Sequence, residues 1–228
     1  MTESSRDIEL RRGQFFEYFR GRLSTVRETT LPSPDRMVLL MASLDALANH
    51  WERTAGLAQR PASSADRMRL FLTLHGGHNA FDRVSVPLLR EQPGAKKARN
   101  ELGSFFPFAR YRTDRMNQVS TWSADPTFKT LEDANLVERN ALVDCSYGGI
   151  LYKRLRCGWI HELAPPQDQV IAPDNHLIVD EPYYRFVTNH EEFLLFMPTI
   201  FLVSTLERVL ASFERETTRL GILPFKEG

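Results

Sequence analysis

This chain of 228 residues has little excess charge of either sign, little cysteine and few long apolar runs. Lysine and arginine together number 29, as do aspartate and glutamate, so the formal net charge is zero. A neutral chain lacks the overall basic excess that is typical of nucleic-acid-binding domains, so any such surface must be a local patch. The cations are mostly arginine, which favours forked, bidentate contacts over diffuse attraction.

The two cysteines, Cys145 and Cys157, are too few for a disulfide framework. On one helix they would lie about 18 Å apart, beyond the reach of a disulfide, and unpaired thiols suit a reducing compartment. The longest apolar run, residues 193–203, contains Pro198 and is too short to cross a bilayer, and the polar N-terminus lacks a signal-peptide core. We therefore expect a soluble cytoplasmic protein without a membrane segment.

Metal-ligand patterns are also scarce. His75 and His78 form an H-x-x-H pattern around two glycines, without further ligands at a familiar spacing. This pattern favours a glycine helix cap with histidine near the helix dipole. We therefore predict no metal and no cofactor.

Hydrophobic periodicity predicts a mainly α-helical single domain over residues 1–228. Four periodic segments are expected to be helices: residues 6–26, 35–55, 65–75 and 131–163. The last of these has a capping-box-like start at Thr130 and a weak point at Gly148-Gly149, which either splits it or marks the close approach of another backbone. A final apolar helix is expected to open at Asn189 and to be kinked or restarted by Pro198.

The remaining segments are predicted to be a long insertion and a small β-hairpin. Residues 88–130 show no regular pattern, and their interleaved aromatic and arginine residues fit either base stacking or a loop anchored to the core by its aromatics. Strand-like pieces at 169–172 and 176–184 predict a hairpin at about residues 169–187.

The segment LYKRLRCGWIHEL, residues 151–163, carries the candidate chemistry. Arg156 and His161 stand five residues apart, about 140° of rotation on an α-helix. A guanidinium binds phosphate oxygens in bidentate fashion and an imidazole exchanges protons near neutral pH, so the pair suits chemistry on a phosphodiester. The same spacing also fits a solvated arginine and a histidine that complements the helix dipole. A second match, Arg185 to His190, falls on a strand end and a loop and receives no role.

Neighbouring residues complete the candidate site. Tyr152, Lys153 and Arg154 are predicted to bind substrate, and Cys157 and Glu162 to support the pair. Asp45 is a further supporting candidate because it lies inside the almost wholly apolar helix 35–55. A buried carboxylate requires a partner, so we expect Asp45 to have a structural partner rather than a catalytic role.

In this context the 151–163 segment resembles the helix that carries the R-x-x-x-x-H motif in HEPN domains (higher eukaryotes and prokaryotes nucleotide-binding). The residues that carry the resemblance are Leu155, Arg156 and the following CGWIHE, residues 157–162. The sequence MASLDALANHW, residues 41–51, is similar to the early core helix of a bacterial HEPN-like group. The resemblance covers about residues 35–90 and 130–215, and it implies an antiparallel helical bundle.

The resemblance also implies an activity. Many HEPN domains are metal-independent endoribonucleases whose two R-x-x-x-x-H helices face each other in a homodimer, where Gly148 and Gly149 would allow close approach. His161 would then exchange protons at the attacking 2′-hydroxyl or the leaving oxygen, and Arg156 would stabilise the charge on the phosphate. The expected products are 2′,3′-cyclic phosphate ends, and the biological role would be that of a toxin or defence effector.

Two alternatives to an enzyme remain open. Cys157 stands where active members often carry Asn, Asp or His, which favours a non-catalytic HEPN-like module that binds nucleotide, RNA or a protein partner. A purely structural role is the third possibility, with Arg156 paired to Glu162 or Asp45. A dimeric groove lined by both motif helices would favour the enzyme, whereas an Arg156 ion pair held in the core would favour the others. Leu163 replaces the tyrosine that a nucleotidyltransferase modifies in one toxin subgroup, so we do not expect that regulation.

Overall fold

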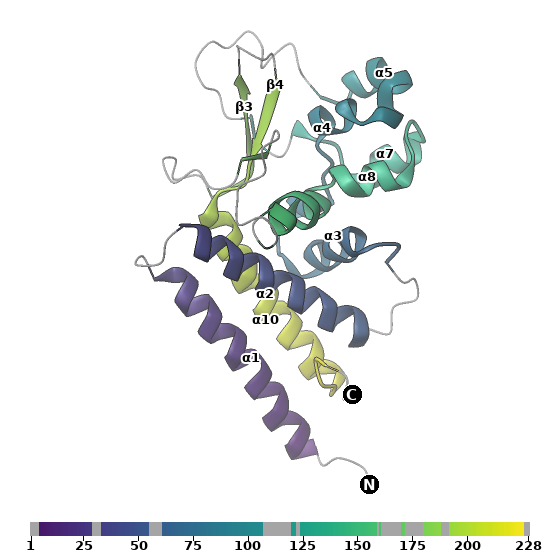
Figure 1. The fold of residues 1–228 in the computed structure, drawn as a ribbon. Coiled ribbons are helices and arrows are strands. Elements are labelled where there is room, and N and C mark those ends of the chain that lie inside the picture. Colours follow the sequence, from purple (N-terminus) through teal and green to yellow (C-terminus); the bar gives the residue numbers. More distant parts are fainter. Residues whose placement is uncertain are drawn as a thin grey trace.

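A computed structural model describes most of the chain: residues 5–28, 33–54, 61–106, 120–121, 124–158, 160, 170–171, 180–187 and 192–225. The fold is mainly helical, as predicted. Its three long helices are α1 (Ser5–Arg27), α2 (Ser33–Thr54) and α10 (Thr199–Leu220), and α1 runs antiparallel to the other two (Figure 1). Across the described residues, no helix has the length and apolarity needed to cross a membrane.

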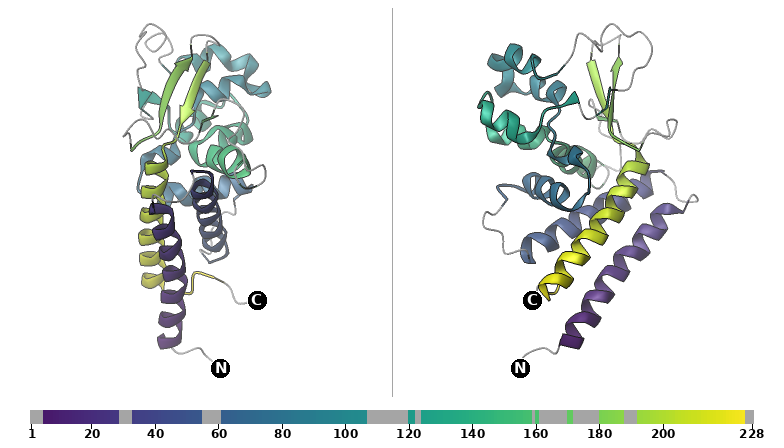
Figure 2. Two further views of the ribbon diagram at one scale, coloured as in Figure 1. Left: turned by 60° about the vertical axis from the view of Figure 1, so that its left-hand side comes forward. Right: turned by 180° about the vertical axis from the view of Figure 1, so that it is seen from behind.

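The long helices pack through apolar stripes at helical spacing. Phe16, Phe19 and Leu23 of α1 are buried, and Phe16 meets Phe213 of α10 edge to face at 5.8 Å between ring centroids. Helix α2 buries an almost continuous apolar face that ends at Trp51. The predicted helices 6–26 and 35–55 are therefore confirmed, and both views in Figure 2 show α1 and α10 side by side.

Helix α3 (Ser64–His75) confirms the predicted helix 65–75. The hydroxyl of Ser63 accepts a hydrogen bond from the Asp66 backbone N–H and caps the helix, as serine at this position favours. Gly76 follows the last helical residue, His75, and donates its backbone N–H to the Leu72 carbonyl. The glycine cap after His75 is thus confirmed.

The predicted helix 131–163 is wrong as a single element. Its described part consists of α7 (Phe128–Ala134), α8 (Arg139–Cys145), α9 (Tyr147–Ile150) and the π-helix η4 (Leu151–Arg156). Asn135 ends α7 in a left-handed conformation (φ 50°), and extended Ser146 separates α8 from α9 while its hydroxyl caps α9. The N-cap of α7 is Thr127 rather than Thr130, because the Thr127 hydroxyl accepts from the Thr130 N–H.

The glycine pair marks a close helix contact inside the chain. A Cβ on Gly148 would lie 2.4 Å from the Cα of Arg69, so α9 lies directly on the backbone of α3. The predicted close approach is therefore confirmed, but its place is not the one expected. This side of Gly148 is occupied by α3, which leaves it unavailable for contact with a second copy.

Much of the predicted insertion is helical. It is preceded by η1 (Asn79–Asp82) and begins with α4 (Val86–Glu91), η2 (Pro93–Ala98) and α5 (Arg99–Gly103). These elements are too short to show a periodic pattern, which is why sequence periodicity missed them. Phe106 is buried against Tyr184 and Phe193, in agreement with an aromatic anchor to the core. Residues 107–119, which hold most of the arginines of this segment, lie outside the described residues.

The strands form one four-stranded sheet in the order β1-β3-β4-β2. The elements are β1 (Ser120–Thr121), β2 (Val170–Ile171), β3 (Tyr183–Val187) and β4 (Glu192–Phe196). Strand β3 pairs antiparallel with β4 and β1, whereas β2 pairs parallel with β4. The hairpin is therefore β3–β4, and the prediction of a hairpin at 169–187 is wrong. Residues 192–196 are strand, and α10 begins only after Pro198, which restarts the chain as a helix.

A buried carboxyl group joins the sheet to the helices. Asp125 accepts hydrogen bonds from the hydroxyl groups of Tyr147 in α9 and Tyr184 in β3, and from the backbone N–H of Val86 in α4. The side chains of Asp125, Tyr147 and Tyr184 are each at most 1% exposed. These contacts fix the hairpin beside the short helices, and the hairpin leads directly into α10 (Figure 1).

Candidate functional site

The first part of the segment that carries the candidate chemistry, Leu151–Arg156, is wound as a π-helix. Leu151 and Leu155 are fully buried and anchor η4 in the core. The backbone N–H of Cys157 reaches the carbonyl of Tyr152, five residues earlier. Cys157 itself is α-helical, whereas Gly158 and Ile160 are again π-helical. π-helices are rare and usually occur as single turns, frequently at functional sites.

Arg156, at the end of η4, is held from two sides. Its Nη2 lies 3.1 Å from Oδ2 of Asp45 in α2. Its guanidinium carbon lies 5.3 Å from the centre of the Tyr152 ring, within the range of a cation–π contact. Asp45 thus has the partner that its position in an apolar helix requires, as predicted.

Asp45 also belongs to a wider ion-pair network between α2 and α3. Its Oδ1 lies 3.4 Å from Nη2 of Arg67, whose Nη1 lies 3.0 Å from Oε2 of Glu52. Asn49 donates to the Asp45 carbonyl at 2.9 Å. The charges of two arginines and two carboxylates cancel in this network. It therefore supplies hydrogen-bond donors in fixed positions rather than a net positive field.

The network is shielded but not closed. The Arg156 side chain is 20% exposed and that of Asp45 is 12% exposed. Burial by itself lowers the pKa of Arg156, but the charge of Asp45 together with Cys157 and Tyr152 outweighs it, and the pKa is raised above its ordinary value. Arg156 is therefore a permanently charged group in a fixed orientation, with part of its surface open to a ligand.

The other predicted site residues are divided between two places. Tyr152 and Cys157 adjoin Arg156, whereas the ammonium group of Lys153 pairs with Asp144 at the surface. Arg154 is partly exposed and has an interaction of its own. His161 and Glu162, like His190 of the second R-x-x-x-x-H match, lie outside the described residues.

Three participants were missed from the sequence: Asn49, Glu52 and Arg67. A usable signal was present for two of them, because Asp45, Asn49 and Glu52 recur at i, i+4 and i+7 and so form one polar stripe on α2. Nothing in the sequence around Arg67 distinguishes it from the other arginines of the chain.

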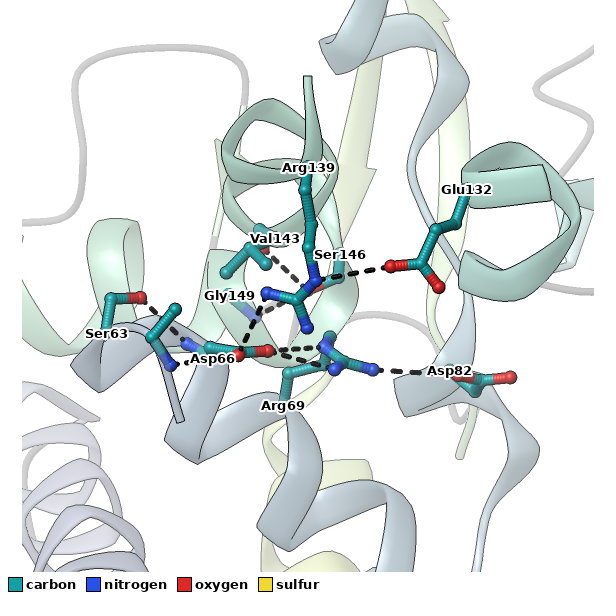
Figure 3. A network of polar contacts seen from close by, with 10 residues as sticks. Ser63, Asp66, Arg69, Asp82, Glu132, Arg139, Val143, Ser146 and Gly149 are labelled. Atoms are coloured by element: carbon teal, nitrogen blue, oxygen red, sulfur yellow. Dashed lines mark hydrogen bonds and ion pairs between the residues drawn. The ribbon is translucent and has the colours of Figure 1, made fainter. Parts of the chain in front are cut away.

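A second charged network, around Asp66, fixes helices to one another (Figure 3). The Asp66 carboxylate accepts from Arg69 at 2.9 Å and from Arg139 of α8 at 3.2 Å, and Arg139 continues to Glu132 of α7. Burial raises the pKa of Asp66, but these hydrogen bonds and one from the Ala62 N–H together lower it by more. The net pKa therefore lies below its usual range. Asp66 is buried and fully engaged, which indicates a structural role.

No cluster of potential metal ligands occurs within the described part of the chain. His75 is buried, its Nδ1 lies 3.0 Å from Ser212 Oγ, and burial lowers its pKa to about 4. It is therefore a neutral core histidine at neutral pH.

Comparison with known proteins gives no family. No protein-family model matches the chain, no characterised protein is found to be related, and no solved structure is similar. The functional conclusion therefore depends on the geometry around Arg156.

Proposed function

We propose that this protein is a HEPN-type, metal-independent endoribonuclease, cytoplasmic and homodimeric, that leaves 2′,3′-cyclic phosphate ends. The observation that carries the proposal is the π-helical winding of the segment that ends at Arg156. The role of a toxin or defence effector belongs to the same proposal.

The winding matters because it changes which residues share a face. On an α-helix, residues four apart lie on one side, and residues five apart diverge by about 140°. A π-helix closes its hydrogen bonds between residues five apart, so that spacing brings side chains toward one face. Five is the separation of Arg156 and His161 in the sequence. The π-helical winding that leads up to Arg156 supports the proposal, because the same winding continued beyond Arg156 would bring His161 toward the face of the guanidinium.

The environment of Arg156 supports the same role. Asp45 and the Tyr152 ring fix the guanidinium before any substrate arrives, so little side-chain entropy remains to be lost on binding. An arginine so held stabilises the extra negative charge on a phosphate in the transition state. Lys153, Arg154 and Tyr152 would bind the neighbouring RNA backbone.

The reaction would be an internal displacement at phosphorus. A base removes the proton of the 2′-hydroxyl, the 2′-oxygen attacks the adjacent phosphorus, and the bond to the 5′-oxygen breaks as that oxygen receives a proton. His161, from one or both protomers, would supply the proton transfers near neutral pH. Arg156 would hold the non-bridging oxygens.

Cleavage of RNA by the purified protein in EDTA tests the proposal. His161→Ala is expected to lower the rate at least a hundredfold, and Arg156→Lys about a hundredfold because lysine lacks the bidentate fork. Cys157→Asn is expected to preserve or raise activity. Matched controls are His78→Ala and Arg99→Lys; Arg99 is a surface arginine paired with Glu91 at 3.0 Å. Cleavage that needs a metal, or that His161→Ala leaves intact, contradicts the proposal.

The Arg156–Asp45 ion pair also favours a second candidate, a non-catalytic HEPN-like module that binds RNA, nucleotide or a protein partner. An arginine that is four-fifths shielded and paired to a carboxylate can have a purely structural role, which is to join η4 to α2. In that case the wild type retards RNA in a gel without cutting it, and His161→Ala leaves retention unchanged.

A further inference from the structure

A pocket of about 520 Å³ lies between α1, α2 and the segment that follows α10, away from Arg156. Its volume falls within the range of about 300–1,000 Å³ that is usual for small-molecule sites. Residues of α1 at helical spacing form one wall: Arg11, Gln14, Phe15, Tyr18, Phe19 and Arg22. Nothing in the proposed nuclease chemistry uses this pocket.

Aromatic rings from three elements meet in the pocket. Phe15 of α1 contacts Phe225 at 5.7 Å between centroids, and it meets the His50 ring of α2 edge to face at 5.0 Å. Burial, with a smaller contribution from the charge of Arg53, lowers the pKa of His50, so its ring is a neutral aromatic surface at neutral pH. The middle of the pocket is thus suited to a flat apolar ring.

The charged groups of the pocket are all positive. Arg11 lies over the Phe225 ring at 5.3 Å, and Arg22 lies over the Tyr18 ring at 5.6 Å. No carboxylate is found among the described residues that line the pocket. The Tyr18 ring orients the Arg22 guanidinium without neutralising it, so this end of the pocket favours an anion.

Arg22 differs from its neighbours on α1. Arg20 pairs with Glu17 and Glu214, and Arg27 pairs with Glu207 at 2.6 Å, so both are neutralised within the chain. Arg22 donates to the Tyr18 hydroxyl at 3.1 Å and forms no ion pair with a described carboxylate. A guanidinium oriented by a phenol ring and its hydroxyl is a built anion contact rather than half of a surface ion pair.

We propose that this pocket binds a small planar aromatic anion. The ring lies against Phe15, Phe19 and His50, and a carboxylate or phosphate group on the ring binds Arg22 and the Tyr18 hydroxyl. A neutral aromatic lacks the anion contact, and an aliphatic anion lacks the stacking. Recognition therefore requires both parts in one molecule.

Calorimetric titration of the full chain tests the proposal with matched probes: 2-naphthoate, 2-naphthyl phosphate, neutral 2-naphthylmethanol and aliphatic octanoate. The two aromatic anions are expected to bind at least tenfold more tightly than the two incomplete probes. The ratio between carboxylate and phosphate identifies the preferred anion. No binding of either aromatic anion at millimolar concentration, or equal binding of all four probes, overturns the proposal.

Variants place the binding in this pocket. Arg22→Gln is expected to weaken 2-naphthoate at least tenfold, whereas Arg27→Gln on the same helix leaves it unchanged. Ala46→Leu adds volume from α2 into the pocket and is expected to abolish binding while the helical circular dichroism persists. Binding that survives both Arg22→Gln and Ala46→Leu overturns the assignment.

Discussion

At the scale of single residues, the polar interior is organised around shared carboxylates. Asp45 forms ion pairs with Arg67 and Arg156, and Asp66 forms ion pairs with Arg69 and Arg139. Each acid therefore joins two cations from different elements. Removing one partner of a shielded pair leaves an uncompensated charge, which costs more than the pair itself contributes. The role of Arg156 therefore depends on how strongly it is coupled to Asp45.

A double-mutant cycle with Asp45→Asn and Arg156→Gln measures that coupling. We expect about 1–2 kcal/mol in the free energy of unfolding in urea, because the two groups are 3.1 Å apart and mostly shielded. The matched cycle at Lys153 and Asp144, whose side chains are 49% and 31% exposed, should give less than about 1 kcal/mol. Equal couplings in the two cycles would show that Asp45 does not fix Arg156.

The sequence predicted this site in part. An acid inside an apolar helix must have a partner, and this argument correctly predicted a structural partner for Asp45. Arg156, which the sequence analysis had named as one possible partner, is that residue. The identity of Arg67 as a second partner depends on the packing of α3 against α2, which local spacing does not encode. The sequence also gave no sign that Tyr152, four residues before Arg156, would support the guanidinium through its ring.

At the scale of elements, the contact between α9 and α3 controls where the π-helix lies. Gly148 lets α9 rest on the Arg69 backbone, and η4 follows directly on α9. Any side chain at Gly148 must displace one of the two backbones, and the displacement would be transmitted to Arg156.

Gly148→Ala is expected to lower the free energy of unfolding by about 1–3 kcal/mol or more, as overpacking does, despite the better helix propensity of alanine. Gly21→Ala in α1 is the matched control. A Cβ there meets nothing within 4 Å, so propensity alone should raise stability by up to about 1 kcal/mol. Thermal or urea unfolding of both variants checks the opposite signs, and a neutral or stabilising Gly148→Ala would contradict the tight contact.

Element prediction succeeded where long periodic faces are present and failed where tertiary pairing decides. Helices α1, α2 and α3 follow from their apolar stripes and caps. The run EFLLF of β4 is equally compatible with a buried helix turn, and only its pairing with β3 and β2 makes it a strand. The breaks at Asn135 and Ser146 depend on single backbone conformations that no periodicity reveals.

At the scale of the whole molecule, the sheet and the helices are held together at Asp125. Tyr184 comes from β3, Tyr147 from α9 and the Val86 N–H from α4, so one buried carboxyl group links three parts of the fold. Burial raises the pKa of Asp125 to about 7, although the hydrogen bonds from Tyr184 and Tyr147 act in the opposite direction.

The raised pKa predicts a pH dependence of stability with a definite sign. In the unfolded chain Asp125 titrates near its ordinary value of 3.8, so between that pH and about 7 the folded state binds more protons than the unfolded state. The stability contributed by Asp125 is therefore greatest below about pH 4 and is lost as the pH rises through 7. His75, with its pKa lowered to about 4, acts in the opposite direction below pH 6.5, so the wild-type profile alone does not isolate Asp125.

The difference in the free energy of unfolding between wild type and Asp125→Asn removes the common histidine contribution. We expect this difference to shrink by about 1–3 kcal/mol between pH 5 and pH 8, because asparagine does not titrate. Urea unfolding of both proteins at several pH values measures it, and Asp133→Asn at the exposed Lys129 pair is a control with no expected change in this range. A difference that stays constant or grows with pH would show that Asp125 is ionised in the folded protein. The link between sheet and helices would then depend on a charged carboxylate held by its three donors.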